Sequence, residues 1–542
     1  MSARRVFGVE TEYAVTALDG AGAAFPRGDF TAGLLAIARK QLSHLPDGHS
    51  TGLFLANGSR FYIDAGDHPE VSSPECLDPW DVVRYSKAGD LILEQLAEGV
   101  RTADPRIARV LIFKGNVDYS AATTWGAHES YGHRAHVGVL QRRLMPHLVS
   151  RVIYTGAGGF NPFSHGLEFM LSPRVAHLTH AFSAESTTQR SIIHTRDESL
   201  AAHGYRRQHL ICGESARSDV ATWLKVGATA LVVAMIEAGV PCGEDVALAA
   251  PLEALRTFAR DPGGRETAAM ASRPPMTALQ IQRRYLDRAV HHAGDRFMPK
   301  WAGAVCERWA DVLDRLERGP AAVASRLDWA MKWKIYEERA RRRGIEWATT
   351  PAWTHVVETL ERARLDAVPR IDRLSVDLVL ARAGPLRAAV TALASYVDAH
   401  GLRWRDLDEF LSLRQQLFEV DTRFGELGAN SLFSILDASG VLDHQVDDDA
   451  MPDARYEPPA AGRARVRGAV IRDAARERRR LVCTWEAIWD PATDAHLDLS
   501  DPFSEREVWE RSTSATSPSA SDRNAWLWGE VSQMLSPSRR TR

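Results

Sequence analysis

Two short stretches decide the fold: RVFGVETEYAV at residues 5–15 and SRFYIDAG at residues 59–66. Both are rich in β-branched or aromatic residues and are bounded by Gly or Asn, which is typical of β-strands. In the first stretch Glu10 and Glu12 are two residues apart, so the two carboxylates share one face of the predicted sheet. Two such carboxylates repel each other unless water or a cation lies between them. Taken alone, the pair also fits a solvated strand face.

The second strand narrows this choice. Its alternation places Phe61 and Ile63 on one face, and on the other it places Arg60, Tyr62 and Asp64, with Glu70 following six residues later. A face of this kind makes a poor hydrophobic core. It suits a hard divalent cation such as Mg²⁺, which binds through a few carboxylates plus substrate phosphates. Neither a GxxxxGK[ST] loop nor a GxGxxG loop is present, so we expect any nucleotide to lie over the sheet face.

Helical periodicity follows these strands. The segment from Pro74 to Val100 carries apolar residues at helical spacing, and further helical patterns occupy residues 218–239, 276–296, 300–318, 324–345 and 352–365. Residues 109–118 and 167–173 have the composition of additional strands. This order predicts an α+β fold with an antiparallel sheet and helices mainly on one face.

Composition excludes several functional classes. The 542 residues carry a formal net charge of −3, which argues against a nucleic-acid partner. The five Cys show no CxxC spacing, so neither a disulfide framework nor a structural zinc site is expected. The apolar run Val226–Ile236 is too short to span a bilayer and predicts a buried core helix. With no signal peptide evident, we expect a cytoplasmic protein that engages no membrane.

The chain divides at an acidic, Pro-rich segment around residues 444–463. We predict a catalytic domain at 1–445, a linker at 446–463 and a small C-terminal domain at 464–510. The last of these is too short to hold a large core alone. Residues 511–542 begin as a Ser-rich, low-complexity segment, for which we predict disorder.

Two further segments allow more than one interpretation. GAHES at 126–130 places His128 beside Glu129, and a structural role is the more common explanation for such a pair. The stretch 194–209 concentrates Arg and His; it suits either a charged helix face or a site for an anionic ligand. A Ser-based catalytic triad is disfavoured, because GES at 213–215 lacks the full GxSxG elbow.

Taken in order, the motifs resemble the Pup ligase and Pup deamidase/depupylase family, whose members are related to glutamine synthetase. The motifs are GVETEY, NGSRFYIDAGDHPE, SSPEC, IFKGNVD, HES, TRDE…YRR…H, LKVGATALV and RARVRG…TWEAIW…DPF. The resemblance runs from residue 5 to about residue 510. It implies a glutamine-synthetase-like curved antiparallel sheet packed with helices, which holds Mg²⁺ and ATP, together with a small C-terminal domain.

The resemblance also implies an activity and its residues. Ligases of this family phosphorylate the C-terminal Glu of Pup, a small protein tag, and transfer it to lysines of target proteins destined for the proteasome. Matching positions suggest Glu10, Tyr62 and Glu70 as magnesium ligands and Asp64 as the general base for the lysine. They also suggest nucleotide contacts from Arg60, Ser73 and Trp485.

The motifs alone do not decide whether the chain belongs with the ligases or with the hydrolases of the family. Hydrolases of the family carry a long insertion after the first strand, whereas about forty residues separate Val15 from Ala56 here, which favours a ligase. The alternatives are a depupylase or deamidase and a divergent nucleotide-binding paralogue. Substrate-side segments depart from the usual family pattern at AHESY (127–131), DESLAA (197–202) and GESA (213–216), and Ser73 replaces the usual Thr.

Overall fold

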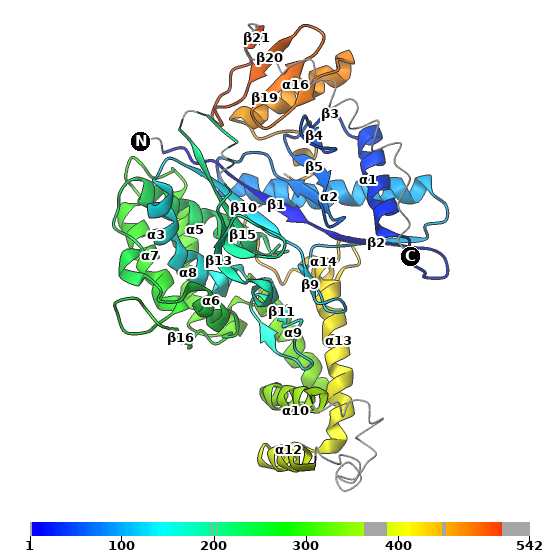
Figure 1. Ribbon diagram of the computed structural model, residues 1–542, viewed down its shortest axis with the longest axis vertical. Coiled ribbons are helices and arrows are strands. Elements are labelled where there is room, and N and C mark those ends of the chain that lie inside the picture. Colours follow the sequence, from blue (N-terminus) through cyan, green and yellow to red (C-terminus); the bar gives the residue numbers. More distant parts are fainter. Residues whose placement is uncertain are drawn as a thin grey trace.

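The computed structural model describes residues 3–196, 198, 200–202, 204–362, 387–446 and 451–511. Within these residues the largest sheet contains nine strands in the order β13-β14-β15-β10-β1-β6-β5-β4-β3 (Figure 1). Its strands are β1 (Phe7–Glu12), β3 (His44–Pro46), β4 (Leu53–Leu55), β5 (Arg60–Ile63), β6 (Pro69–Ser72), β10 (Ala127–His133), β13 (His180–Ser183), β14 (Ser191–His194) and β15 (Arg206–Gly213). The predicted α+β class is confirmed.

The sheet is antiparallel except at one edge, where β13 and β14 are parallel. The expectation of a wholly antiparallel sheet is wrong there, because the chain returns along the edge between these two strands before β14 begins. Smaller sheets pair β2 (Ala14–Leu18) with β7 (Arg109–Phe113), β8 (Val117–Asp118) with β9 (Thr123–Thr124), β11 (Gly159–Phe160) with β12 (Phe169–Met170), and β16 (Thr267–Ala268) with β17 (Met276–Thr277).

The helices include every one that the sequence predicted. They are α1 (Arg27–Gln41), α2 (Pro79–Ala103), α3 (Val137–Ser150), α4 (Val152–Thr155), α5 (Asp219–Glu237), α6 (Pro251–Ala259), α7 (Ala278–His292), α8 (Ala302–Leu316), α9 (Asp328–Arg342), α10 (Thr350–Arg362), α12 (Arg387–Ala399), α13 (Leu407–Gly425), α14 (Leu432–Ala438), α15 (Met451–Ala454) and α16 (Arg463–Glu477). Helix α2 begins later than predicted because Asp78 caps it, accepting a hydrogen bond from the Asp81 backbone. Helices α10, α12 and α13 extend away from the sheet (Figure 1).

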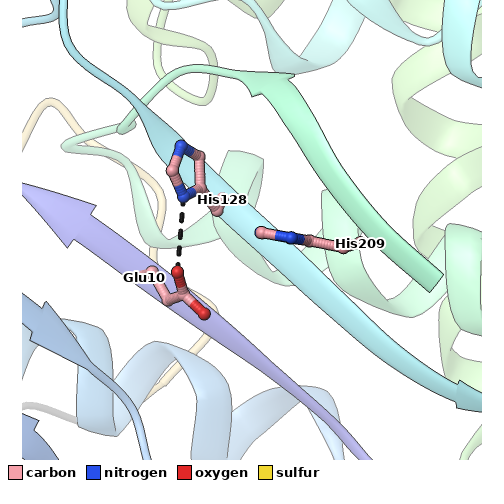
Figure 2. A group of neighbouring side chains, drawn as sticks. All are labelled: Glu10, His128 and His209. Carbon is pink, nitrogen blue, oxygen red and sulfur yellow. Dashed lines mark hydrogen bonds and ion pairs between the residues drawn. The ribbon is translucent and has the colours of Figure 1, made fainter. Parts of the chain in front are cut away.

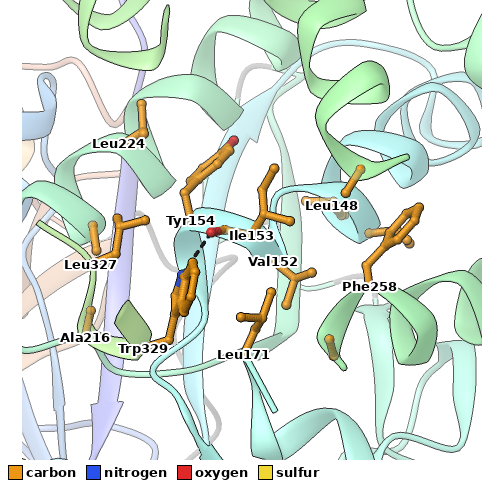
Figure 3. Close-up of a cluster of buried hydrophobic side chains, with 14 of the residues drawn as sticks. Leu148, Val152, Ile153, Tyr154, Leu171, Ala216, Leu224, Phe258, Leu327 and Trp329 are labelled. Atoms are coloured by element: carbon orange, nitrogen blue, oxygen red, sulfur yellow. Dashed lines mark hydrogen bonds between the residues drawn. The ribbon is translucent and has the colours of Figure 1, made fainter. Parts of the chain in front are cut away.

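Helix α5 is the centre of the hydrophobic core. It is long and apolar enough to cross a bilayer by length and composition, yet its whole apolar window is buried inside the protein. The prediction of a buried core helix is therefore confirmed. Figure 3 shows part of this core, in which Leu224 of α5 lies among side chains from several elements and the Trp329 indole donates a hydrogen bond to the Ile153 carbonyl at 2.9 Å.

The main sheet presents two chemically different faces. In β1 the side chains of Phe7, Val9 and Thr11 are buried, while Glu10 and Glu12 point to the opposite face. Helices α2 and α5 pack against β1 and β10, so they cover the face that carries the apolar side chains. The opposite, polar face, which carries Glu10 and Glu12, is therefore the one that can hold a functional site.

In strand β10 the neighbouring residues His128 and Glu129 point to opposite faces of the sheet. Glu129 points into the core, where its carboxylate is fully buried and pairs with Arg151 at 2.6 Å. Lys225 of α5 adds positive charge, and the Tyr131 hydroxyl donates to the same carboxylate. Glu129 is thus structural, whereas His128 points to the polar face with Glu10.

Residues near the C-terminus pack against the edge of the main sheet. Strands β18 (Val482–Cys483), β19 (Ala487–Asp490), β20 (Ala495–Asp498) and β21 (Trp509–Arg511) form a sheet beside α16. Their hydrophobic core includes Leu45, Phe54 and Ala56 from the N-terminal part of the chain. We therefore propose that 464–510 is a lobe that completes its core on the catalytic domain. Most of the predicted tail, residues 512–542, and part of the predicted linker, residues 447–450, lie outside the described residues.

We expect the substitution Arg151→Met to destabilise the protein by about 3–5 kcal/mol, because it removes the only direct ion-pair partner of the buried Glu129 carboxylate among the described residues. Urea denaturation followed by circular dichroism measures this loss. The matched control is Arg341→Met, which removes an exposed guanidinium paired with Glu338 and should leave the unfolding midpoint unchanged. Equal midpoints for the two variants would contradict a structural role for this pair.

Candidate functional site

The register of the central strands gathers acidic side chains on the polar face. Glu12 lies opposite Glu70 on the neighbouring strand β6, and Glu70 in turn lies opposite Tyr62 on β5. On the other side of β1, Glu10 lies opposite His128 of β10. Residues from four strands therefore share one face, which we call the acidic face.

His128 lies between the two carboxylates of β1. Its Nδ1 is 3.3 Å from an oxygen of Glu10, and its Nε2 is 3.6 Å from an oxygen of Glu12. Figure 2 shows His128 beside Glu10, with His209 of β15 close by. Two sets of possible ligand atoms lie within 4.8 Å of one another: Glu10 with His128 and His209, and Glu12 with Glu70 and His128.

The electrostatics of Glu70 fit a bound cation. Burial raises the pKa of this carboxyl well above its usual range, and Glu10 and Glu12 raise it further. Within the described residues its Oε1 atom is buried and has no hydrogen-bond partner. Within the described residues the Nε2 atom of His209 is likewise buried and has no hydrogen-bond partner. Burial lowers the pKa of this imidazole well below its usual range. Glu70 and His209 belong to different ligand sets, so a divalent cation in the set of Glu12, Glu70 and His128 would satisfy the Glu70 oxygen.

Two of the three predicted magnesium residues lie in neighbouring ligand sets that share His128. Glu10 and Glu70 belong to the two ligand sets, whereas the Tyr62 hydroxyl forms a hydrogen bond with Glu70, and burial next to Glu70 raises its pKa well above the usual range. Glu12 joins the same set as Glu70. The sequence indicated the shared strand face of Glu10 and Glu12, but it did not indicate that His209 lies close to them.

Asp64, the predicted general base, lies at the end of β5 in a tight turn. Its Oδ1 atom accepts hydrogen bonds from the backbone N–H groups of Gly66 at 2.8 Å and His68 at 2.6 Å. Partial burial raises the pKa of Asp64, and the nearby Glu12 adds to this effect against the hydrogen bond from His68. A carboxylate with a raised pKa is better suited to accept a proton near neutral pH.

A pocket opens beside the acidic face, between β1, β6 and the C-terminal lobe. Its lining includes Glu10, Ser73, Glu75, Arg207 and Trp485. Of the three residues predicted to contact nucleotide, Ser73 and Trp485 thus line one pocket although they are far apart in sequence. Arg207 donates to Glu10 at 2.9 Å and to the Ser130 hydroxyl at 2.9 Å, which offsets the negative charge of the acidic face.

Arg60 and Ser73 already make contacts within the protein, which limit the further interactions that they can make with a ligand. The Arg60 guanidinium is 2.7 Å from Asp47 and stacks on the Tyr62 ring, with 4.0 Å between Cζ and the ring centroid. The Ser73 hydroxyl accepts from the Val9 N–H at 3.0 Å and donates to the Pro74 carbonyl at 3.0 Å. One lone pair of this hydroxyl remains for a ligand. The sequence analysis missed Asp47 because it lies outside both strands.

The sequence model described as "Pup-ligase protein" matches residues 5–358 and 388–489. This chain belongs to the Pup-ligase protein family. The Pup--protein ligase of Geodermatophilus obscurus is 31% identical over 509 residues, which cover 92% of this chain and 94% of that ligase. The Pup deamidase/depupylase of Mycolicibacterium smegmatis is 39% identical over 303 residues, or 55% of this chain. That alignment spans only 60% of the depupylase.

Solved structures of the Pup-ligase family agree with the fold. The crystal structure of the complex between the prokaryotic ubiquitin-like protein Pup and its ligase PafA aligns with a TM-score of 0.71 at 26% identity, covering 99% of this chain and 96% of that chain. The structure of the Pup ligase PafA in complex with ADP aligns with a TM-score of 0.65 at 26% identity, covering 90% and 93%. The expected family and fold are thereby confirmed.

Two of the three segments that depart from the usual Pup-ligase family pattern, AHESY and DESLAA, contribute to the same pocket, whereas Glu214 and Ser215 of GESA line a different one. Ser130 of the AHESY segment binds Arg207, and Leu200 and Ala201 of the DESLAA segment line the pocket. Residues 197 and 199 of that segment lie outside the described residues. The stretch 194–209 is not a helix in its described part: it contains the end of β14, a loop and the start of β15. The charged-helix interpretation is wrong because the chain needs both strands to extend the sheet.

We expect Glu70→Gln to stabilise the metal-free protein near pH 8, by about 1.4 kcal/mol for each unit by which the pKa of Glu70 is raised, because glutamine carries no charge to bury beside Glu10 and Glu12. The raised pKa means that wild-type stability falls as pH increases through that pKa, because the folded state must lose a proton that it holds more tightly than the unfolded state does. Differential scanning calorimetry with and without Mg²⁺ measures both effects. The variant should also lose the Mg²⁺-dependent rise in Tm.

The control for this experiment is Glu98→Gln, which neutralises an exposed carboxylate on α2 that pairs with Arg101. It should keep both the wild-type pH dependence and the response to Mg²⁺. A Glu70→Gln variant that still gained stability from Mg²⁺ would contradict the assignment of this carboxylate to a cation site.

Proposed function

We propose that this chain is an ATP- and Mg²⁺-dependent ligase that joins the C-terminal Glu of a Pup-like protein tag to lysines of target proteins. The observation that carries the proposal is Asp64, a carboxylate of raised pKa at the end of β5, the strand that also contributes Tyr62 to the acidic face. The alignment with the Geodermatophilus obscurus ligase, which covers 94% of that protein, supports the ligase branch.

The reaction has two steps. An oxygen of the tag's Glu side chain attacks the γ-phosphorus of ATP, which forms an acyl phosphate and releases ADP. The amine of a target lysine then attacks the carbonyl carbon, which forms an isopeptide bond and releases phosphate. A lysine ammonium is not a nucleophile, so a base must remove a proton before this attack.

We assign Asp64 to this base. Its Oδ1 atom is held by two backbone N–H groups, so the carboxylate keeps a fixed orientation while the second oxygen stays available. Burial and the neighbouring Glu12 hold its pKa above the usual value for an aspartate, which favours transfer of the lysine proton to it.

The remaining predicted residues divide between the cation and the nucleotide. Glu10 and Glu70 would hold Mg²⁺, with Tyr62 orienting Glu70. When bound, Mg²⁺ offsets the charge of the phosphates during transfer. Ser73 and Trp485 would contact the nucleotide from the pocket wall, with Arg60 approaching from β5, which lies next to β6. Arg207, which lines the same pocket, would exchange its contact with Glu10 for a phosphate oxygen.

The partners follow from this chemistry. The ligase acts on two polypeptides, the tag and a lysine-bearing target, and the tagged product goes to the proteasome. We therefore propose that the protein works in the cytoplasm, with no nucleic acid and no membrane involved.

A depupylase or deamidase is the second candidate, supported by the 39% identity with the Mycolicibacterium smegmatis depupylase over 303 residues. Such an enzyme would hydrolyse the tag's amide or isopeptide bond without consuming ATP stoichiometrically. Incubation of the protein with a Pup conjugate, Mg²⁺ and a non-hydrolysable ATP analogue separates the two. Cleavage of the conjugate would overturn the ligase assignment. If the protein binds Mg²⁺ and ATP but neither conjugates the tag nor cleaves the conjugate, it is a nucleotide-binding paralogue.

We expect Asp64→Asn to lower the rate of tag conjugation at least ~100-fold, in line with the loss of a general base. Binding of ADP should stay within twofold of the wild type, because the asparagine oxygen can still accept both backbone hydrogen bonds. A gel assay of tag conjugation and isothermal titration calorimetry with ADP measure the two quantities.

The control is Asp67→Asn, an exposed residue of the same turn with φ of 59°, a conformation that asparagine tolerates. It should conjugate at the wild-type rate. Conjugation by Asp64→Asn at a rate close to that of this control would show that Asp64 is not the base.

A further inference from the structure

A fully buried arginine of helix α16 connects the two halves of the nucleotide pocket. The Arg467 side chain has 0% exposure, and guanidinium groups are rarely buried to this extent unless they are paired. One of its nitrogens donates to the Gly58 carbonyl at 3.0 Å, at the turn between β4 and β5. The arginine therefore reaches from the C-terminal lobe into the catalytic domain.

The partner of Arg467 is Glu75, which follows the strand that carries Ser72 and lines the pocket. Arg467 donates to Glu75 at 3.2 Å and in a second, shorter contact, and Arg463 donates to it at 2.6 Å. Burial acts to raise the pKa of Glu75, but Arg467 and Arg463 outweigh it and hold the pKa at about 2. Glu75 is thus a permanent anion clamped by two cations.

The other neighbour of Arg467 is Trp485. The guanidinium carbon lies 4.9 Å from the centroid of the Trp485 ring and 5.5 Å from that of Phe54. Phe54 also packs edge-on against Trp485, with 5.0 Å between centroids and 84° between planes. The indole therefore contacts both an aromatic ring and a cation, and it also lines the pocket.

We propose that Arg467 is a positioning residue for the nucleotide: it touches Glu75 and Trp485, which line the pocket, and fixes both in place. The ligand of the pocket rests on the proposed function. Arg467 itself does not line the pocket, and its guanidinium is already paired with the Glu75 carboxylate. It therefore acts through its neighbours rather than by binding a phosphate.

Arginine is required here rather than any cation. Its planar group can donate to Gly58, pair with Glu75 in two contacts and stay close to an aromatic ring at the same time. A lysine would keep the positive charge beside Glu75. It would lose the simultaneous hydrogen bonds to Glu75 and Gly58 and the planar contact with Trp485. Arg467→Lys therefore tests position separately from charge.

The experiment measures ADP binding by isothermal titration calorimetry with Mg²⁺, and the KM for ATP together with kcat in the conjugation assay. For Arg467→Lys we expect the Kd for ADP and the KM for ATP to rise about tenfold, as for loss of one well-placed cation–π contact, with kcat within twofold. Trp485→Leu should show a similar loss. The double variant should bind less weakly than the two separate losses combined would give, because Arg467 acts in part through that ring.

The matched control is Arg476→Met on the exposed face of α16, where the side chain is 73% exposed. It should bind ADP with the wild-type Kd. Glu75→Gln, which keeps the shape of the carboxyl group but removes its charge, provides a second test if Arg467→Lys does not fold, and it should weaken ADP binding in the same way.

Wild-type Kd for ADP in folded Arg467→Lys or Glu75→Gln would overturn the inference, as would additive losses in the double variant. A loss of kcat at saturating ATP with unchanged KM would also overturn it. If the wild-type protein itself bound neither ADP nor ATP, the proposed function would fail instead, so the two failures are distinguishable.

Discussion

The repulsion among carboxylates on one face of the sheet is the constraint on which the rest of the site depends. Glu10, Glu12 and Glu70 lie close together where burial weakens the screening by water, and like charges at such distances oppose one another. The chain offsets part of this repulsion through Arg207, which binds Glu10, and through the raised pKa of Glu70. A divalent cation would offset the repulsion that remains.

The opposite face of the sheet keeps these carboxylates in register. Phe7 and Val9 anchor β1 in the helical core, and a shift by one residue would bury Glu10 and Glu12 instead. The buried pair of Glu129 and Arg151 holds β10 in the same way, which places His128 opposite Glu10. The polar chemistry of one face is therefore stabilised by apolar packing and one internal ion pair on the other.

The site is completed from the far end of the chain. Helix α16 and strand β19 share a core with β4, so the C-terminal lobe lies against the strand that precedes β5. The proposed nucleotide pocket is then a joint product of residues such as Ser73 and Trp485, which are separated by some four hundred positions. Buried charges at this junction connect nucleotide affinity to the packing of the lobe.

The sequence by itself determined the local features: two-faced strands at Glu10 and Tyr62, the amphipathic helices and the apolar helix α5, since each leaves a periodic trace in neighbouring residues. Only the tertiary structure decided that His209 lies beside Glu10, that Asp47 and Arg467 contact residues of the site, and that β13 runs parallel to β14. These residues come from segments whose own patterns indicate only a strand, a turn or a helix. Strand register and the buried junction with the C-terminal lobe bring them together, and neither is encoded in any local periodicity.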